Sequence, residues 1–300
     1  MESARARFRQ LEPGQRSQLC LGTIDGGEPV VVYETSGALF EAPNWSPDGE
    51  WLLFNQDGDL YRIAPEPGSR PEKLRIDGDV AANNDHVLSP DGATVYISAM
   101  DGHLYAVPFA GGAPVRVSNQ HDQPFWYFLH GVSPDGATLA YVGAERGPDN
   151  RLGTINVYTI PSRGGPDRRL TAWRYHDDGP EYTPDGAWIY FNSEYGSDAA
   201  GHAQVCRMRP DGSDVARITE DERVNWFPHP SPDGELVLYL SYPPGTQGHP
   251  ANKEVVLRLM RPDGSGRRDL VWLNGGQGTS NVNGWAPDSR RFAYVAYPIG

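Results

Sequence analysis

One short turn phrase, of the Ser-Pro-Asp-Gly type, recurs six times along this chain of 300 residues. Proline presets φ, aspartate suits the next turn position, and glycine adopts the positive φ that closes a hairpin. Successive copies lie 43 to 55 residues apart, a period typical of propeller blades. The copies begin at Ser46, Ser89, Ser133, Thr183, Ser231 and Ala286. The repeat therefore predicts an all-β fold, a six-bladed β-propeller.

The segments around each turn have the pattern of antiparallel strands. A short apolar run follows every turn, as at 51–54, and predicts the second strand of a blade. Outer strand pairs follow five of these runs and begin at Leu60, Leu104, Val157, Val205 and Val256. A sixth pair of the same form lies near the N-terminus. We therefore expect residues 17–35 to complete the last blade, formed by 280–297, so that 1–300 is one closed domain without an open seam.

Composition narrows the classes of partner and location. The formal net charge is −13, so nucleic acids and anionic membranes, which need basic surfaces, are not expected partners. No apolar stretch approaches the roughly 18 residues of a membrane span. The charged start has no apolar segment behind it and does not have the form of a signal peptide, so we expect a soluble, cytoplasmic protein. No Walker loop or dinucleotide fingerprint is present, so no nucleotide cofactor is expected.

The residues around the turns resemble a known blade signature. The phrases 44–49, Asn-Trp-Ser-Pro-Asp-Gly, and 283–288, Asn-Gly-Trp-Ala-Pro-Asp, are similar to those of TolB-type propellers. The resemblance extends over nearly the whole chain. It implies the fold, while members of such families serve as scaffolds, binding modules or enzymes. Because we expect neither the secretion signal nor the additional N-terminal domain of TolB, we do not expect a role in the Tol–Pal envelope system.

One face of the predicted propeller carries the long loops and the histidines. The loops between second and third strands share this face with the crossings between blades, and three of these loops are long: 143–153, 193–202 and 242–252. All eight histidines fall in these loops or crossings, or at the start of innermost strands. Long loops on a rigid scaffold commonly carry binding sites. We expect a ligand site at this mouth of the central channel.

The candidate residues fall into three roles. Imidazole together with carboxylate is suited to a divalent cation such as manganese, zinc, iron or calcium, and to acid–base catalysis. The candidate metal ligands are His86, His130 and His229. The candidate proton-transfer groups are Glu181 and Asp178. The remaining candidates for ligand binding are Asn84, Asp85, Trp126, His176, Trp226, His249 and Gln277.

A second resemblance bears on function. Oligogalacturonate lyases are similar to TolB-type propellers and hold manganese through histidine and glutamine in the central funnel; His86, His130, His229 and Gln277 are residues of those types. We therefore expect a small polar ligand, of carbohydrate type, in the funnel, with a divalent metal and lyase- or epimerase-type activity. The alternative is a non-enzymatic scaffold for a protein partner, with an exposed apolar patch around Tyr195 or Tyr242.

Overall fold

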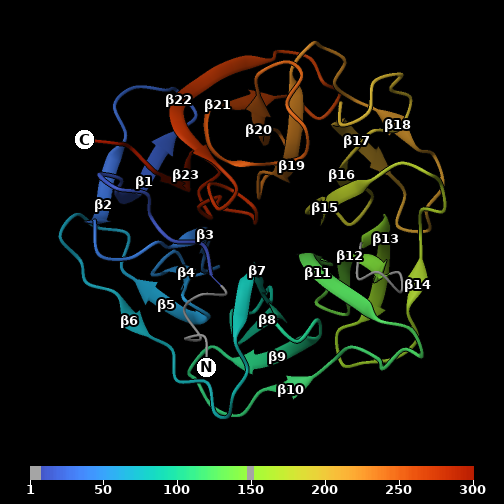
Figure 1. Cartoon of the computed structure of the whole chain (residues 1–300), viewed down its shortest axis with the longest axis horizontal. Coiled ribbons are helices and arrows are strands. Elements are labelled where there is room, and N and C mark those ends of the chain that lie inside the picture. Colours follow the sequence, from blue (N-terminus) through green and yellow to red (C-terminus); the bar gives the residue numbers. More distant parts are fainter. Residues whose placement is uncertain (1–7, 147–151) are drawn as a thin grey trace.

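The computed structural model describes residues 8–146 and 152–300. These residues contain no helix and form six antiparallel sheets set around a central axis, as Figure 1 shows. The prediction of an all-β, six-bladed propeller is therefore confirmed. We number the blades in chain order from the first turn phrase, so that the two termini share blade six.

The strands of each blade follow one another from the axis outward. Blade one contains β3 (Glu41–Trp45), β4 (Leu52–Gln56), β5 (Asp59–Ile63) and β6 (Glu72–Lys73). Blade two contains β7 (Ala82–Leu88), β8 (Thr94–Ala99), β9 (Leu104–Pro108) and β10 (Val115–Arg116). Blade three contains β11 (Phe125–Val132), β12 (Thr138–Arg146), β13 (Leu152–Pro161) and β14 (Arg168–Arg169).

The second half of the chain repeats this order. Blade four contains β15 (Asp177–Tyr182), β16 (Ile189–Ser193), β17 (Gln204–Met208) and β18 (Ala216–Arg217). Blade five contains β19 (Val224–Pro230), β20 (Val237–Tyr242), β21 (Ala251–Met260) and β22 (Arg268–Gly276). Blade six contains β23 (Arg291–Ala296), then β1 (Ser17–Thr23) and β2 (Val30–Thr35) from the N-terminus.

The turn phrase connects the first and second strands of a blade by a fixed set of hydrogen bonds. In blade one the Ser46 hydroxyl donates to the Asp48 carboxylate and accepts the backbone N–H of Trp51 at 2.9 Å. The same carboxylate accepts the N–H of Glu50 at 3.0 Å. Gly49 has a φ of 78°, which its lack of a Cβ permits. The repeated phrase is thus a structural turn, and its aspartate is occupied in holding it.

The N-terminal strands close the ring as predicted. Strand β1 pairs with β23 from Gln18 opposite Ala296 to Thr23 opposite Arg291, and it also pairs with β2. The expected innermost strand of blade six, however, is not regular. Gly276 and Gly278 have φ of 108° and 87°, so the segment after β22 coils before it reaches the sheet. It contacts β23 through an isolated bridge and separate backbone hydrogen bonds.

One of the predicted long loops is largely strand. Strands β12 and β13 continue their pairing as far as Arg146 opposite Leu152, so most of the segment 143–153 belongs to a hairpin and its residues 147–151 lie outside the described part of the chain. The segments after β16 and β20 are loops, as predicted.

The apolar core lies between blades. Each of six clusters of buried side chains joins two neighbouring blades; Phe40 and Phe54, for example, pack with Val295 across the junction of blades one and six. Cys20 and Cys206 occupy comparable third strands, and both thiols are free and buried. Burial raises the pKa of the Cys20 thiol to about 12, which agrees with a packing role.

A bulge in the innermost strands decides where their side chains point. The pairing register shifts within β3, β7, β11, β15 and β19, a few residues before each turn. At the bulge Ala42, Gly179 and Phe227 have φ between 52° and 61°. Side chains before and after the bulge line different parts of the channel.

Candidate functional site

Two cavities lie along the central channel, one toward each face. The crossing-face cavity, on the side of the loops and crossings, has a volume of about 240 Å³. The turn-face cavity, on the side of the repeated turns, has a volume of about 400 Å³. His130 lines both. The crossing-face cavity is lined by Asn83, Asn84, Asp85, Phe128, His130, Val142, Ile155, Asp178, Phe227, His249, Gln277 and Asn281.

The crossing-face cavity gathers six of the residues predicted from the sequence, which come from four blades. They are Asn84, Asp85, His130, Asp178, His249 and Gln277. Each lies on an innermost strand or on a segment that reaches the axis from blade five. The predicted ligand site therefore has a physical counterpart on the predicted face.

An ion pair lies at the centre of this cavity. His130 Nε2 is 2.9 Å from Asp178 Oδ1, and His130 Nδ1 donates to the backbone oxygen of Asn281 at 3.1 Å. Burial by itself lowers the pKa of His130, but Asp178 and Asp85 outweigh it and raise the pKa to about 9. Burial likewise raises the pKa of Asp178, yet attraction to His130 leaves it below its usual value. At neutral pH the pair is charged on both sides.

Asp85 is the carboxyl group of this cavity whose pKa burial raises above its usual value. It is 4% exposed, and burial raises its pKa to about 7 against the attraction of His130. Asn83 donates from its side-chain amide to Asp85 Oδ2 at 3.0 Å. Among the hydrogen bonds of the described residues, this one engages Oδ2, and Oδ1 lines the cavity side of the carboxyl group available to a ligand. A carboxyl group that titrates near neutral pH can either accept or donate a proton.

A second imidazole stands beside the pair, nearer to solvent. His249 Nε2 lies 3.6 Å from Asp178 Oδ2, while its Nδ1 makes a hydrogen bond with Gln277 Oε1. Gln277 Oε1 also accepts the side-chain N–H of Asn281 at 3.1 Å. Trp226 packs on the His249 ring, with centroids 4.5 Å apart. The loop histidine is thus held in position over the cavity by contacts on three sides.

The three predicted metal ligands are not brought together. His86 is fully buried and its Nδ1 contacts Asn44 Oδ1 at 2.8 Å; burial lowers its pKa to about 3. Both nitrogens of His229 are occupied, Nδ1 by Glu181 at 2.6 Å and Nε2 by the Ser280 carbonyl at 2.9 Å. In the described residues no three His, Cys, Asp or Glu side chains are placed to hold a metal ion. As arranged, these residues do not fit a divalent cation, and the metal site stays a prediction.

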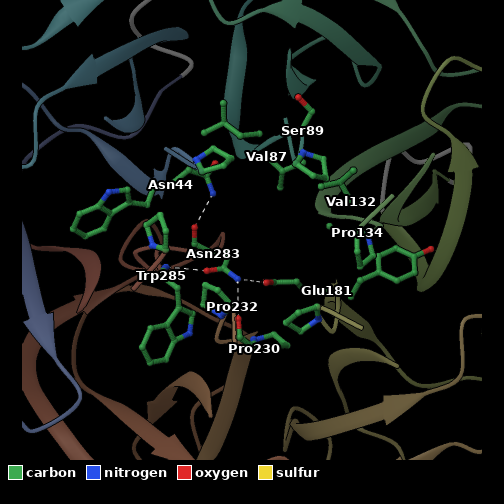
Figure 2. A pocket seen from close by; sticks show the side chains of 18 of the residues that line it. Asn44, Val87, Ser89, Val132, Pro134, Glu181, Pro230, Pro232, Asn283 and Trp285 are labelled. Atoms are coloured by element: carbon green, nitrogen blue, oxygen red, sulfur yellow. Dashed lines mark hydrogen bonds between the residues drawn. The ribbon is translucent and has the colours of Figure 1, made fainter. Parts of the chain in front are cut away.

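The two predicted proton-transfer groups are separated. Asp178 lines the crossing-face cavity, whereas Glu181 lines the turn-face cavity. The bulge at Gly179 lies between them, with a register shift from Asp178 to Glu181. Figure 2 shows Glu181 pointing toward Asn283 on the turn-face side. Of the two, Asp178 is therefore the one placed with Asp85 and His130.

Other predicted residues lie at the margin. His176 is exposed, and its Nδ1 accepts the Ile155 N–H at 3.4 Å. Trp126 stacks on Phe128 with centroids 6.1 Å apart. The apolar patch expected for a scaffold is not found at Tyr242, which is fully buried because its ring packs in the core between blades five and six.

Comparison with known proteins identifies the family. The chain is 42% identical over 286 residues to an uncharacterised protein of Agrobacterium fabrum, covering 94% of this chain and 92% of that one. It matches the solved structure of a TolB-like protein from Agrobacterium tumefaciens with a TM-score of 0.84 and 40% identity, over 95% and 99% of the two chains. The family model for the TolB beta propeller domain matches residues 133–256. The chain belongs to the TolB-like propellers.

With more distant matches this TolB-like propeller shares only its fold. The Tol-Pal system protein TolB of Francisella tularensis is 22% identical over 280 residues, and the match covers 91% of this chain but 60% of that protein. An oligogalacturonate lyase in complex with manganese superposes with a TM-score of 0.58 and 15% identity, over 89% and 75% of the chains. No helix long and apolar enough to cross a membrane occurs in the described part of this propeller.

Two asparagines that line the cavities of this TolB-like propeller were not among the predicted residues. Asn281 lies five residues before its turn phrase, as Asn84 and Asp178 do, and lines the same cavity. Asn283 lies three residues before it, as His130 does, and donates to Glu181. Alignment of the six turns would have drawn attention to both, because equivalent positions of a propeller face the axis in the same way.

Proposed function

We propose that the crossing-face cavity binds a small, hydroxyl-rich ligand of carbohydrate type and that its acid–base groups support lyase- or epimerase-type proton transfer. The observation that carries this proposal is the grouping of Asp85, whose pKa is about 7, with the charged His130–Asp178 pair in one cavity of about 240 Å³. Carboxylates and amides in such a pocket accept and donate hydrogen bonds to hydroxyl groups.

The division of roles follows from which atoms are free. His130 and Asp178 satisfy one another, so they set the charge of the cavity and position its walls. Asp85 Oδ1 is available to accept or return a proton at a ligand carbon or hydroxyl. The Asn84 amide and His249 Nε2 remain available to orient hydroxyl groups. Asp85 is thus the proposed general base, and the others bind or position.

Charge favours a neutral sugar over a uronide. At neutral pH the groups with altered pKa values in this cavity are the anionic Asp178, the partly ionised Asp85 and the protonated His130. With these groups alone, a ligand carboxylate would meet net repulsion in a site of low dielectric. We therefore expect neutral monosaccharides and oligosaccharides to bind more tightly than the corresponding uronic acids.

The test is a calorimetric screen of matched neutral and uronic sugars against three proteins: the wild type, Asp85→Asn and Asp91→Asn. Asp91 lies in a turn on the opposite face and serves as the control for loss of one carboxylate. A neutral sugar that binds wild type and Asp91→Asn but not Asp85→Asn supports the ligand site. Uptake of solvent deuterium at the carbon next to the sugar carbonyl or carboxylate, which holds the electron pair left by the proton, supports proton transfer if NMR shows that it is lost in Asp85→Asn.

The outcomes separate binding from catalysis. Binding without deuterium uptake would leave a binding protein and remove the enzymatic part of the proposal. Failure of every sugar to bind would overturn the carbohydrate ligand. The cytoplasmic location stays a prediction, to be checked by fractionating cells of the host.

A further inference from the structure

The turn-face cavity is a second enclosure to which every blade contributes. Its wall is a ring built from the repeated turns, in which the prolines Pro47, Pro90, Pro134, Pro184, Pro232 and Pro287 succeed one another around the axis. Neighbouring turns contact each other: a Cβ placed at Gly92 would lie 3.5 Å from Pro47, and one at Gly136 would lie 3.6 Å from Pro90. Turns that pack on one another, each with a conformationally fixed pyrrolidine ring, form a preorganised opening.

The polar groups inside this cavity already have partners. Asn283 donates from its side chain to Glu181 and to the Pro230 carbonyl, and its Oδ1 accepts the Trp285 N–H at 2.9 Å, as drawn in Figure 2. Asn44 donates to the Asn283 carbonyl at 2.9 Å. These two asparagine side chains are therefore engaged with the protein and not directed to a ligand.

Glu181 does not make the interior anionic. His229 Nε2 faces a carbonyl, which can only accept, so this nitrogen carries a hydrogen. The 2.6 Å contact between His229 Nδ1 and Glu181 Oε2 requires one more proton between them. Whichever atom holds that proton, the two side chains together carry no net charge. His130 also lines this cavity, and its charge is balanced by Asp178 at 2.9 Å. Val87, Val132 and Trp45 supply apolar parts of the wall.

The outer edge of the cavity has the opposite character. Each lining proline is followed by a turn residue of the acidic set Asp48, Asp91, Asp135, Asp185, Asp233 and Asp288. In the described part of the chain Asp288 has an arginine partner, Arg291, at 2.7 Å, whereas Asp48, Asp91 and Asp135 accept only hydroxyl and backbone donors. In blades one to three, the turn carboxylates thus accept hydrogen bonds but have no cationic partner among the described contacts, and they follow the prolines that line the cavity.

The same edge already accommodates one cation. The Arg291 guanidinium lies 5.0 Å from the centre of the Trp45 ring while it pairs with Asp288. An aromatic face beside a carboxylate is a favourable environment for an organic cation. On the side of blades one to three, no such arginine is present among the described contacts, and the corresponding carboxylates face solvent.

We propose that the turn-face cavity is a binding site for a small organic cation with an apolar body, such as an aromatic or alkyl ammonium ion. The apolar body enters the proline ring, whose volume of about 400 Å³ is within the range of small-molecule pockets. The charged group stays at the mouth, directed to Asp48, Asp91 and Asp135. This site is independent of the crossing-face cavity and of its proposed sugar.

The probe is 2-phenylethylammonium, with 2-phenylethanol as the neutral match and phenylacetate as the anionic match, titrated by calorimetry at low and high salt. We expect the cation to bind about five-fold more tightly than the alcohol at low salt, with the advantage shrinking as salt screens the edge. Equal binding of all three compounds would remove the charge recognition, and binding of none would overturn the site.

Two pairs of substitutions locate the charge. The double variant Asp91→Asn and Asp135→Asn keeps a side-chain oxygen to accept the turn hydrogen bonds and removes two charges. Asp211→Asn and Asp263→Asn remove two charges from Pro-Asp-Gly turns of the outer strand pairs, whose prolines, unlike Pro90 and Pro134, do not line the cavity. We expect about a three-fold loss of affinity for the cation in the first pair only. An equal loss in both pairs would show a general effect of net charge and contradict the site.

Filling the cavity locates the apolar body. Val132→Trp places a large ring into the wall and should weaken binding of the cation more than ten-fold, while Asn84→Ala in the other cavity should leave it unchanged. Val87→Phe is a second filling variant, so that a folding defect in one leaves the test intact. Unchanged binding in a folded filling variant would place the ligand elsewhere and overturn the proposal.

Discussion

The two ends of the central channel are built from the same repeat but differ in how their polar groups are partnered. On the crossing face, Asp85 and His249 keep atoms free beside the charged His130–Asp178 pair. On the turn face, Glu181 is neutralised by His229, and prolines from all six blades line the wall. The first arrangement suits proton transfer and hydroxyl recognition, and the second suits an apolar body.

The bulge explains how one strand supplies both ends. Residues five positions before a turn, such as Asp178 and Asn281, line the crossing-face cavity. Residues two positions before it, such as Asn44 and Glu181, line the turn-face cavity. The register shift lies between these positions. The difference between the two cavities is therefore a difference in residue type at two places in the repeat.

The largest effect is expected from Asp178→Asn. This change removes the partner of a buried imidazolium, so we expect the free energy of unfolding at pH 7 to fall by about 3 kcal/mol. The NMR-measured pKa of His130 should fall from its value of about 9, because the first attraction that raises it is lost. Urea denaturation gives the energy. A loss below about 1 kcal/mol would mean that the pair contributes little to stability and would weaken the contrast between the cavities.

Asp85→Asn should have a smaller effect of opposite sign at alkaline pH. The pKa of Asp85 is raised to about 7, so the folded state keeps a proton that the unfolded state loses near pH 4. Stability contributed by this group is present below about pH 4 and is lost as the pH rises to 7. The variant should therefore gain about 2 kcal/mol over wild type between pH 4.5 and pH 8. A pH-independent difference between the urea midpoints would contradict this assignment.

Ser289 tests the rigidity of the turn-face ring. It occupies the place of the turn glycine in blade six, with a φ of 56°, and its hydroxyl accepts the Asp233 N–H at 3.0 Å. Ser289→Ala keeps the unfavourable φ and loses the acceptor, so we expect thermal unfolding to report a loss of about 1 kcal/mol. Ser289→Gly also loses the acceptor but relieves φ, and should be closer to wild type. The reverse order would indicate that this hydrogen bond does not stabilise the ring.

The smallest effect is expected from Asp91→Asn. The carboxylate is exposed and accepts bonds that an asparagine oxygen can also accept, so stability should change by less than about 0.5 kcal/mol. Asp178, at the other end of the channel, is buried beside His130, so Asp178→Asn should change the free energy of unfolding far more. If urea denaturation showed equal effects at Asp91 and Asp178, the two cavities would not differ in electrostatic coupling.

Much of the fold could be predicted because its signals are local. The Pro-Asp-Gly turns and the apolar runs behind them specify strand ends through φ, side-chain hydrogen bonds and alternation, and their number specifies the blades. The irregular innermost segment of blade six was not predicted. Its course depends on how the backbone bends at Gly276 and Gly278 against neighbouring segments of the same chain.

The candidate site was predicted in part for the same reason. Position before a turn indicated that Asp85, His130 and Asp178 face the axis, and they do line one cavity. The metal set His86, His130 and His229 rested on residue type and on the shared face of the predicted propeller, neither of which specifies the atoms that a side chain meets. Which atom each histidine meets depends on partners from other blades, such as Asn44 for His86. The spacing of residues within one blade therefore cannot predict these contacts.

By itself, the sequence determined a closed ring of six blades, the place of the N-terminal strands in the last blade, and the set of side chains that reach the axis. These follow from turn chemistry and period, which act over a few residues. Only the tertiary structure decided that Asp178 and Glu181 serve different cavities, that Asp85 titrates near neutral pH, and that His229 is paired. Those properties arise from burial and from neighbours on other blades, and both exist only once the ring has closed.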